Sequence, residues 1–99
     1  MPERLADMTL PEKLREADKL VRELIHHLEH GFIPKAHQLR HTARLANDPQ
    51  EAGEVTDMTI RSLVESVLES DQFSRHVTNQ LQECLSAIDD DTLRALRRR

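Results

Sequence analysis

Apolar residues recur along residues 10–28 at spacings of four, three, four, three and four positions. This rhythm keeps all of them on one side of an α-helix, and it is typical of a helix that packs along a seam with another helix. The sequence therefore predicts a long amphipathic helix whose apolar side needs a cover. The positions that form this seam are Leu10, Leu14, Ala17, Val21, Leu24 and Leu28.

Two more apolar residues, Leu20 and Ile25, flank this seam and widen the apolar stripe to roughly 140° at 100° per residue. Two interpretations remain open. The whole stripe is ordinary core within one chain, or part of it is a binding surface for another protein. The second interpretation predicts these partner-binding residues: Leu14, Leu20, Val21, Leu24, Ile25 and Leu28.

Residues that typically start or stop helices divide the chain. Thr9 and Glu12 form the sequence pattern of a capping box, and Gly31 is a natural residue to end the first helix. Ser70 or Asp71 is expected to cap a later helix, and the acids at 89–91 are expected to break the chain before the last one. The expected helices cover about 9–30, 34–46, 57–69 and 70–88, followed by a short helix carrying Leu93 and Leu96.

We therefore predict an all-α fold, a small bundle of four main helices plus a short C-terminal helix, completed by dimerisation. Residues 1–8 are expected to be a flexible arm, and residues 9–99 a single helical domain. The second predicted helix can bury little of the apolar stripe of the first, because its expected inward face carries mainly small residues. These are Ala36, Leu39, Ala43 and Ala46.

Composition supports helices and a small core. The 99 residues include two glycines and two aromatic residues, both Phe, and 37% of the chain is hydrophobic. Strand-rich folds need more glycine-containing turns than this chain has. A domain of this size is often marginally stable alone, which favours burial of further apolar surface against a partner.

Charge and cysteine content restrict the partners. The net charge is −4, and the main basic cluster is at the C-terminus (Arg94, Arg97, Arg98 and Arg99). We interpret these arginines as cations that stabilise the end of a helix, and we expect neither nucleic acid nor membrane as a partner. The single Cys84 fits a reducing compartment, and the first residues lack the apolar run of a secretory signal, so the cytoplasm is the expected location.

Five of the six histidines lie between positions 26 and 41. His26 and His30, and likewise His37 and His41, are spaced i and i+4, which is a spacing that chelates transition metals from one helix face. The run 26–34 resembles the His-rich helix end of hemerythrin-like proteins over about nine residues. That family also uses histidines from an earlier helix, which this chain lacks before His26, so its iron chemistry is not carried over. We expect solvated histidines and no cofactor; a metal- or pH-responsive protein is the alternative.

No arrangement of residues predicts catalysis. Cys84 falls on an apolar helix face, where a free cysteine usually acts as a small hydrophobic residue. The serines occupy helical or capping positions, and two glycines 22 positions apart cannot form a phosphate-binding loop. We therefore predict a non-enzymatic, self-associating interaction module, a small regulatory adaptor or inhibitor that binds another protein, for example a transcription regulator.

Overall fold

The computed structural model describes residues 5–98, and every element within this range is helical. The prediction of an all-α fold is confirmed. A short 3-10 helix (Leu5–Asp7) precedes α1 (Leu10–His27), and a π-helical turn (Leu28–Phe32) joins α1 to α2 (Ile33–Ala46). A second 3-10 helix (Ala52–Glu54) lies between α2 and α3 (Asp57–Arg97). Half of the predicted arm 1–8, residues 1–4, lies outside the described residues.

Local side-chain bonds explain where α1 and α3 begin. The Thr9 hydroxyl accepts the backbone N–H of Glu12 at 3.3 Å, and the Glu12 carboxylate accepts the N–H of Thr9 at 3.2 Å. The predicted capping box is therefore confirmed. At the start of α3, Thr56 has the same role, because its hydroxyl accepts the backbone N–H of Thr59 at 3.1 Å.

The predicted count of four main helices and a short fifth is wrong, and Gly31 is the first reason. The backbone does not turn into the left-handed region at Gly31, and no described glycine has a positive φ. The helical path continues, and the N–H of Ile33 bonds to the carbonyl of Leu28, five positions back. Pro34 has no N–H and crowds the turn before it, and one widened turn relieves this conflict without ending the helix.

The second error lies in α3, which runs for 41 residues through both predicted breaks. Ser70 is buried inside the helix instead of capping a new one. Asp91 binds Lys13 of α1 through one carboxylate oxygen and Arg94 through the other. Residues that often cap helices here lie within one. Asp91 is held by its two cationic partners, and the backbone carbonyl of Ser70 accepts a hydrogen bond from His27.

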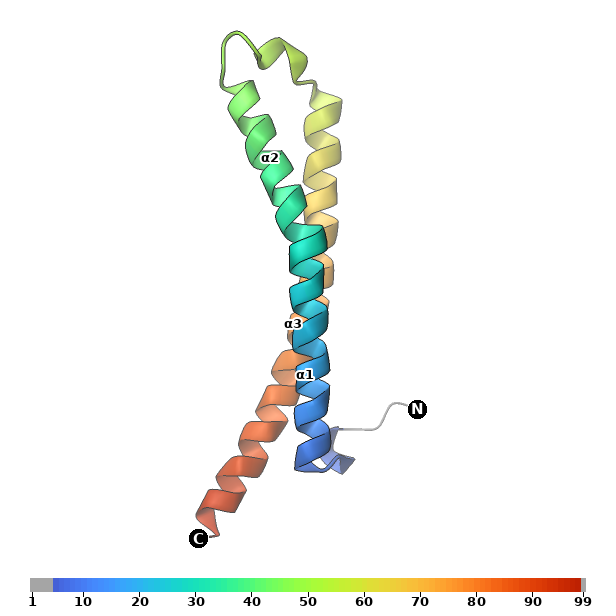
Figure 1. Ribbon diagram of the computed structural model, residues 1–99, viewed down its shortest axis with the longest axis vertical. Helices are drawn as coiled ribbons and strands as arrows, with labels where there is room; N and C mark the ends of the chain where they lie inside the picture. The colour runs from blue at the N-terminus through green and yellow to red at the C-terminus, as the bar shows by residue number, and fades with distance from the viewer. Residues whose placement is uncertain (1–4, 99) are drawn as a thin grey trace. The chain divides into compact units, whose positions relative to one another are not determined.

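The described residues form two compact units, one made of residues 5–25 and 75–98 and the other of residues 26–74. Within the first unit, α1 packs antiparallel to the C-terminal part of α3 around Ala17, Leu20, Val77 and Cys84. Within the second unit, α2 and the first part of α3 run antiparallel and are joined by residues 47–56 (Figure 1). The expected inward face of α2 is partly wrong, since Ala43 and Ala46 are exposed, whereas Thr42 and Leu45 are half-buried.

Candidate interaction surface

The wide apolar stripe of α1 divides into a packed half and an open half. Ala17 and Leu20 are buried against α3, and Leu24 packs at the edge of the same core. The open half consists of three residues that remain substantially in solvent. Leu14 is 52% exposed, Val21 37% and Ile25 49%. One neighbouring helix thus covers only part of the stripe.

The open half of α1 continues onto α3. At 100° per residue, Leu14, Val21 and Ile25 lie about 90° from the line of packed residues, and Leu85 lies about as far from the packed line of α3. The two helices are antiparallel. A rotation of about 90° from the packed line, in the direction of increasing residue number, therefore leads to the same side of the pair on both helices. Leu85 is 50% exposed. We call the surface made by Leu14, Val21, Ile25 and Leu85 the open face.

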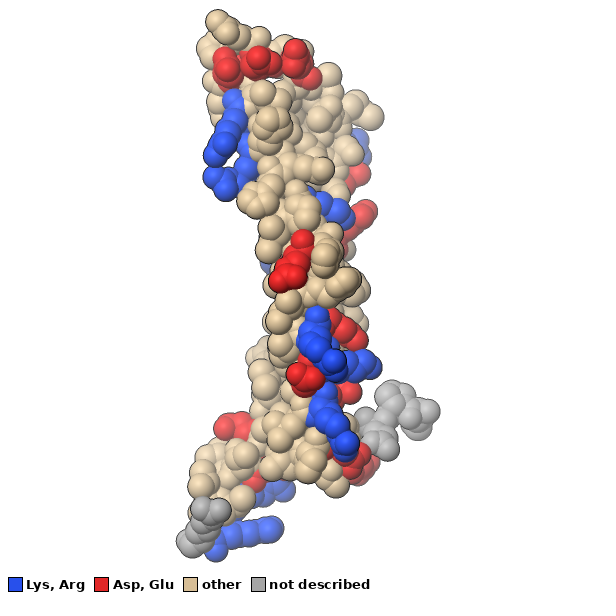
Figure 2. All heavy atoms as spheres, viewed as in Figure 1, with Lys and Arg blue, Asp and Glu red and all other residues tan. Residues whose placement is uncertain are grey.

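A shallow groove adjoins the open face on α3. It has a volume of about 400 Å³ and is lined mainly by uncharged side chains. In Figure 2, charged side chains form a ridge along α1, and other residues cover the surface between this ridge and the C-terminal part of α3. Apolar and neutral polar atoms with charge at the rim are typical of protein interfaces. The lining residues are Thr78, Leu81, Gln82, Leu85, Ser86 and Asp89.

The opposite side of the same unit is polar and partly covered. Leu5 and Met8, from the segment before α1, line a hollow there together with Glu16, Lys19 and Glu83. Among the described residues before α1, Leu5 and Met8 thus lie on the polar side of this two-helix layer.

The predicted partner-binding residues thus fall into two groups. Leu14, Val21 and Ile25 belong to the open face. Leu20 is 5% exposed and lies in the core, Leu24 packs against the core, and Leu28 is half-buried in the π-helical turn. Leu85 was not among the predicted contact residues, because periodicity alone does not reveal which side of α3 faces α1.

A charged pair lies inside the same unit. The ammonium of Lys13 binds the carboxylate of Asp91, with side chains that are 5% and 22% exposed. Donation from Lys13 lowers the pKa of Asp91 below its ordinary value. Burial raises the pKa of the Cys84 thiol, whose sulfur contacts the carbonyl oxygen of Lys13 at 3.2 Å. The thiol is therefore protonated and enclosed, which is the environment of a structural cysteine.

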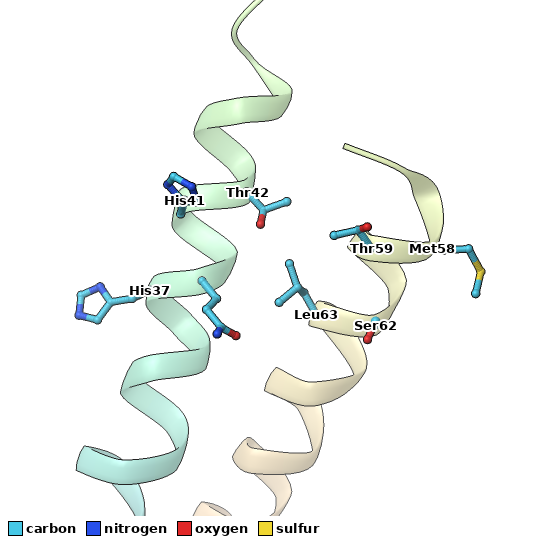
Figure 3. Close-up of a pocket in the computed structure, with 8 residues that line it drawn as sticks. His37, His41, Thr42, Met58, Thr59, Ser62 and Leu63 are labelled. Carbon is cyan, nitrogen blue, oxygen red and sulfur yellow. The ribbon is translucent and has the colours of Figure 1, made fainter. Parts of the chain in front are cut away.

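The four histidines proposed as metal ligands remain in pairs. The rings of His26 and His30 have centroids 4.6 Å apart. His37 and His41 line a groove of about 780 Å³ between α2 and α3, where Thr42 faces Thr59 and Leu63 while both imidazoles point away from α3 (Figure 3). Among residues 5–98, no three His, Cys, Asp or Glu side chains are grouped so that they could hold a metal ion.

His27, which the sequence did not single out, connects the π-helical turn to α3. Its Nε2–H donates to the carbonyl oxygen of Ser70 at 2.9 Å, and its ring lies 4.4 Å from that of Phe73, tilted by 47°. Gly31 provides the space, because a Cβ there would come within 3.2 Å of the His27 ring. The partners are 43 positions apart, so no local sequence signal marks the bond.

Within residues 5–98, no helix combines the length and the apolar content that a membrane span requires. Comparison of the chain with protein-family models, with curated proteins and with solved structures finds no match.

Proposed function

We propose that this protein is a non-enzymatic helical interaction module, a small regulatory adaptor or inhibitor, and that it binds another protein through the open face. The observation that carries the proposal is the division of the α1 stripe. Leu20 and Ala17 are packed, whereas Leu14 and Ile25, on the same helix, are about half exposed. Apolar residues left in solvent beside a packed core favour a binding role over a purely structural one.

The expected affinity follows from the size of the open face. Covering four aliphatic side chains that are roughly half exposed gives roughly 3–6 kcal/mol. Loss of translational and rotational freedom costs an amount of the same order or more. A partner therefore has to contact the adjoining groove and the charged rim as well, which favours an extended helical surface over a short peptide.

The environment of Cys84 supports a role without nucleophilic catalysis by this thiol. The thiol of Cys84 is 1% exposed, and its raised pKa disfavours the thiolate that a nucleophile needs. A free, buried cysteine also suits a reducing compartment, and we propose a cytoplasmic location on this ground.

Site-specific photo-crosslinking tests the proposal. A photoreactive residue placed at position 14 or 25 is expected to form protein adducts, in purified protein or in extract of the source cell. The matched controls are positions 15 and 23, which lie on the polar side of α1 and are exposed. Equal adduct yields at all four positions, or none at positions 14 and 25, would show that the open face is not a binding surface.

A further inference from the structure

We propose that the open face binds the open face of a second copy of this chain, with the α1 helices of the two copies antiparallel across a two-fold axis. This inference rests on the proposed function and names the partner of the same surface.

The first support is the architecture of the unit. In this unit, α1 and the C-terminal part of α3 form one layer of two helices, and a helix in a single layer is covered on one side only. The apolar stripe of α1 is wider than that side, which leaves Leu14, Val21 and Ile25 uncovered. The same two-helix layer of a second copy, placed face to face with the first, completes a four-helix core.

The second support is the charge around the open face. At 100° per residue, the charged residues of α1 and α3 in this unit that fall on the open side are Asp18, Arg22, Arg75 and Asp89. They comprise two acids and two bases, one of each on each helix. The chain as a whole carries −4, so two copies repel on average, whereas this side is balanced and favours contact between copies.

The third support is the order of these charges along α1. The midpoint of Asp18 and Arg22 is position 20, and the midpoint of Leu14 and Ile25 lies between positions 19 and 20. A two-fold axis at this level places Asp18 of each copy opposite Arg22 of the other, while the apolar side chains meet between them. Parallel α1 helices in register would instead place like charges together.

The charges on α3 have the same symmetry. Arg75 and Asp89 lie at equal distances from position 82, beside the half-buried Leu81. In each copy Asp18 and Arg22 already form an ion pair of 3.2 Å, with side chains 66% and 73% exposed. Such a surface pair contributes little to stability, so exchanging it for contacts between copies has a small cost.

Sedimentation equilibrium of the purified full chain tests this geometry. The wild type is expected to dimerise at high micromolar concentration. Asp18→Arg and Arg22→Asp each create two like-charge contacts, and each should weaken the dimer roughly tenfold. An equimolar mixture of the two variants restores opposite charges at both contacts and should recover the dimer. The double variant Asp18→Arg/Arg22→Asp should dimerise as the wild type does.

Each of the other outcomes contradicts one specific part of this proposal. If the wild type stays monomeric, the partner is not a second copy of this chain. Adducts from positions 14 and 25 in cell extract would then still support the proposed function. A dimer that resists both charge variants, or whose mixture shows no recovery, excludes the antiparallel pairing. A dimer that withstands Leu14→Gln/Ile25→Gln, with Arg15→Gln/Glu23→Gln as control, excludes the open face. Circular dichroism of every variant establishes that the helices are retained.

Discussion

Lys13 and Asp91 are 78 positions apart in the sequence, and their side chains join α1 to the last turns of α3. Lys13 is almost fully enclosed, whereas Asp91 retains some contact with solvent. The two partners are therefore not equivalent. Loss of the carboxylate leaves a buried ammonium without its anion, which is the costlier way to break such a pair.

We therefore expect Asp91→Asn to destabilise the protein more than Lys13→Met does. The methionine retains most of the buried aliphatic volume of Lys13 and needs no counter-charge. Urea unfolding followed by circular dichroism gives the order of the two midpoints. The opposite order would mean that the packing of Lys13 matters more than its charge.

The same pair predicts how stability depends on pH. The pKa of Asp91 is lower in the folded protein than in the unfolded chain. Its contribution is thus complete at pH values above the unfolded pKa of about 3.9 and is lost as pH falls through the folded pKa. We expect the difference in unfolding free energy between wild type and Asp91→Asn to be constant from pH 7 to about pH 5 and to shrink below about pH 4. A difference that shrinks already above pH 5 would contradict the lowered pKa.

The two halves of the α1 stripe predict different mutational effects. Leu20→Ala removes a core side chain and should cost about 2–4 kcal/mol. Leu14→Ala removes a half-exposed one and should cost less than about 1 kcal/mol in the monomer. Chemical denaturation at low micromolar concentration separates the two values, and equal losses would place Leu14 in the core.

Gly31 and His27 should be energetically coupled. Gly31 has helical backbone angles, so alanine there gains up to about 1 kcal/mol of helix propensity. Its Cβ would also press on the His27 ring. We expect Gly31→Ala to stabilise the His27→Ala background by about 0.5–1 kcal/mol and the wild type by less. A double-mutant cycle measures this difference, and an additive cycle would show that the ring does not need the space.

The histidine pairs give a prediction for the metal-responsive alternative. Two imidazoles at i and i+4 supply two ligands of the four that zinc prefers, so each pair alone should bind Zn²⁺ weakly. Calorimetry of the wild type, His26→Ala/His30→Ala and His37→Ala/His41→Ala shows whether the pairs act independently. Tight binding lost in both variants would indicate a joint site and favour the metal-responsive function.

The sequence predicted those parts of the fold that local rules determine. The all-α class, the start of α1 at its capping box and the width of its stripe follow from periodicity and short-range bonds. The predicted helix count was wrong at three residues. At Gly31 a widened turn before Pro34 continues the helix, whereas Ser70 and Asp91 are bonded to His27 and Lys13, far away in the sequence. Such long-range partners override the local preference to end a helix.

The same limit applies to the candidate surface. Periodicity placed Leu14, Leu20 and Ile25 on one broad stripe, but the direction from which α3 approaches decides which of them stay in solvent. Leu85 became recognisable only when Val77 and Cys84 had defined the packed line of α3.

The connection at residues 47–56 joins two arms of the chain, the residues before it and the residues after it. It takes no part in the principal bonds between these two arms. Lys13 to Asp91, Cys84 to the Lys13 carbonyl, and His27 to Ser70 all join a residue before this connection to one after it. A chain cut at the exposed residues 48–50 would therefore keep every one of these bonds. What the intact connection supplies is a high effective concentration of one arm around the other, and two separately made fragments should reassemble once they are mixed at a concentration that replaces it.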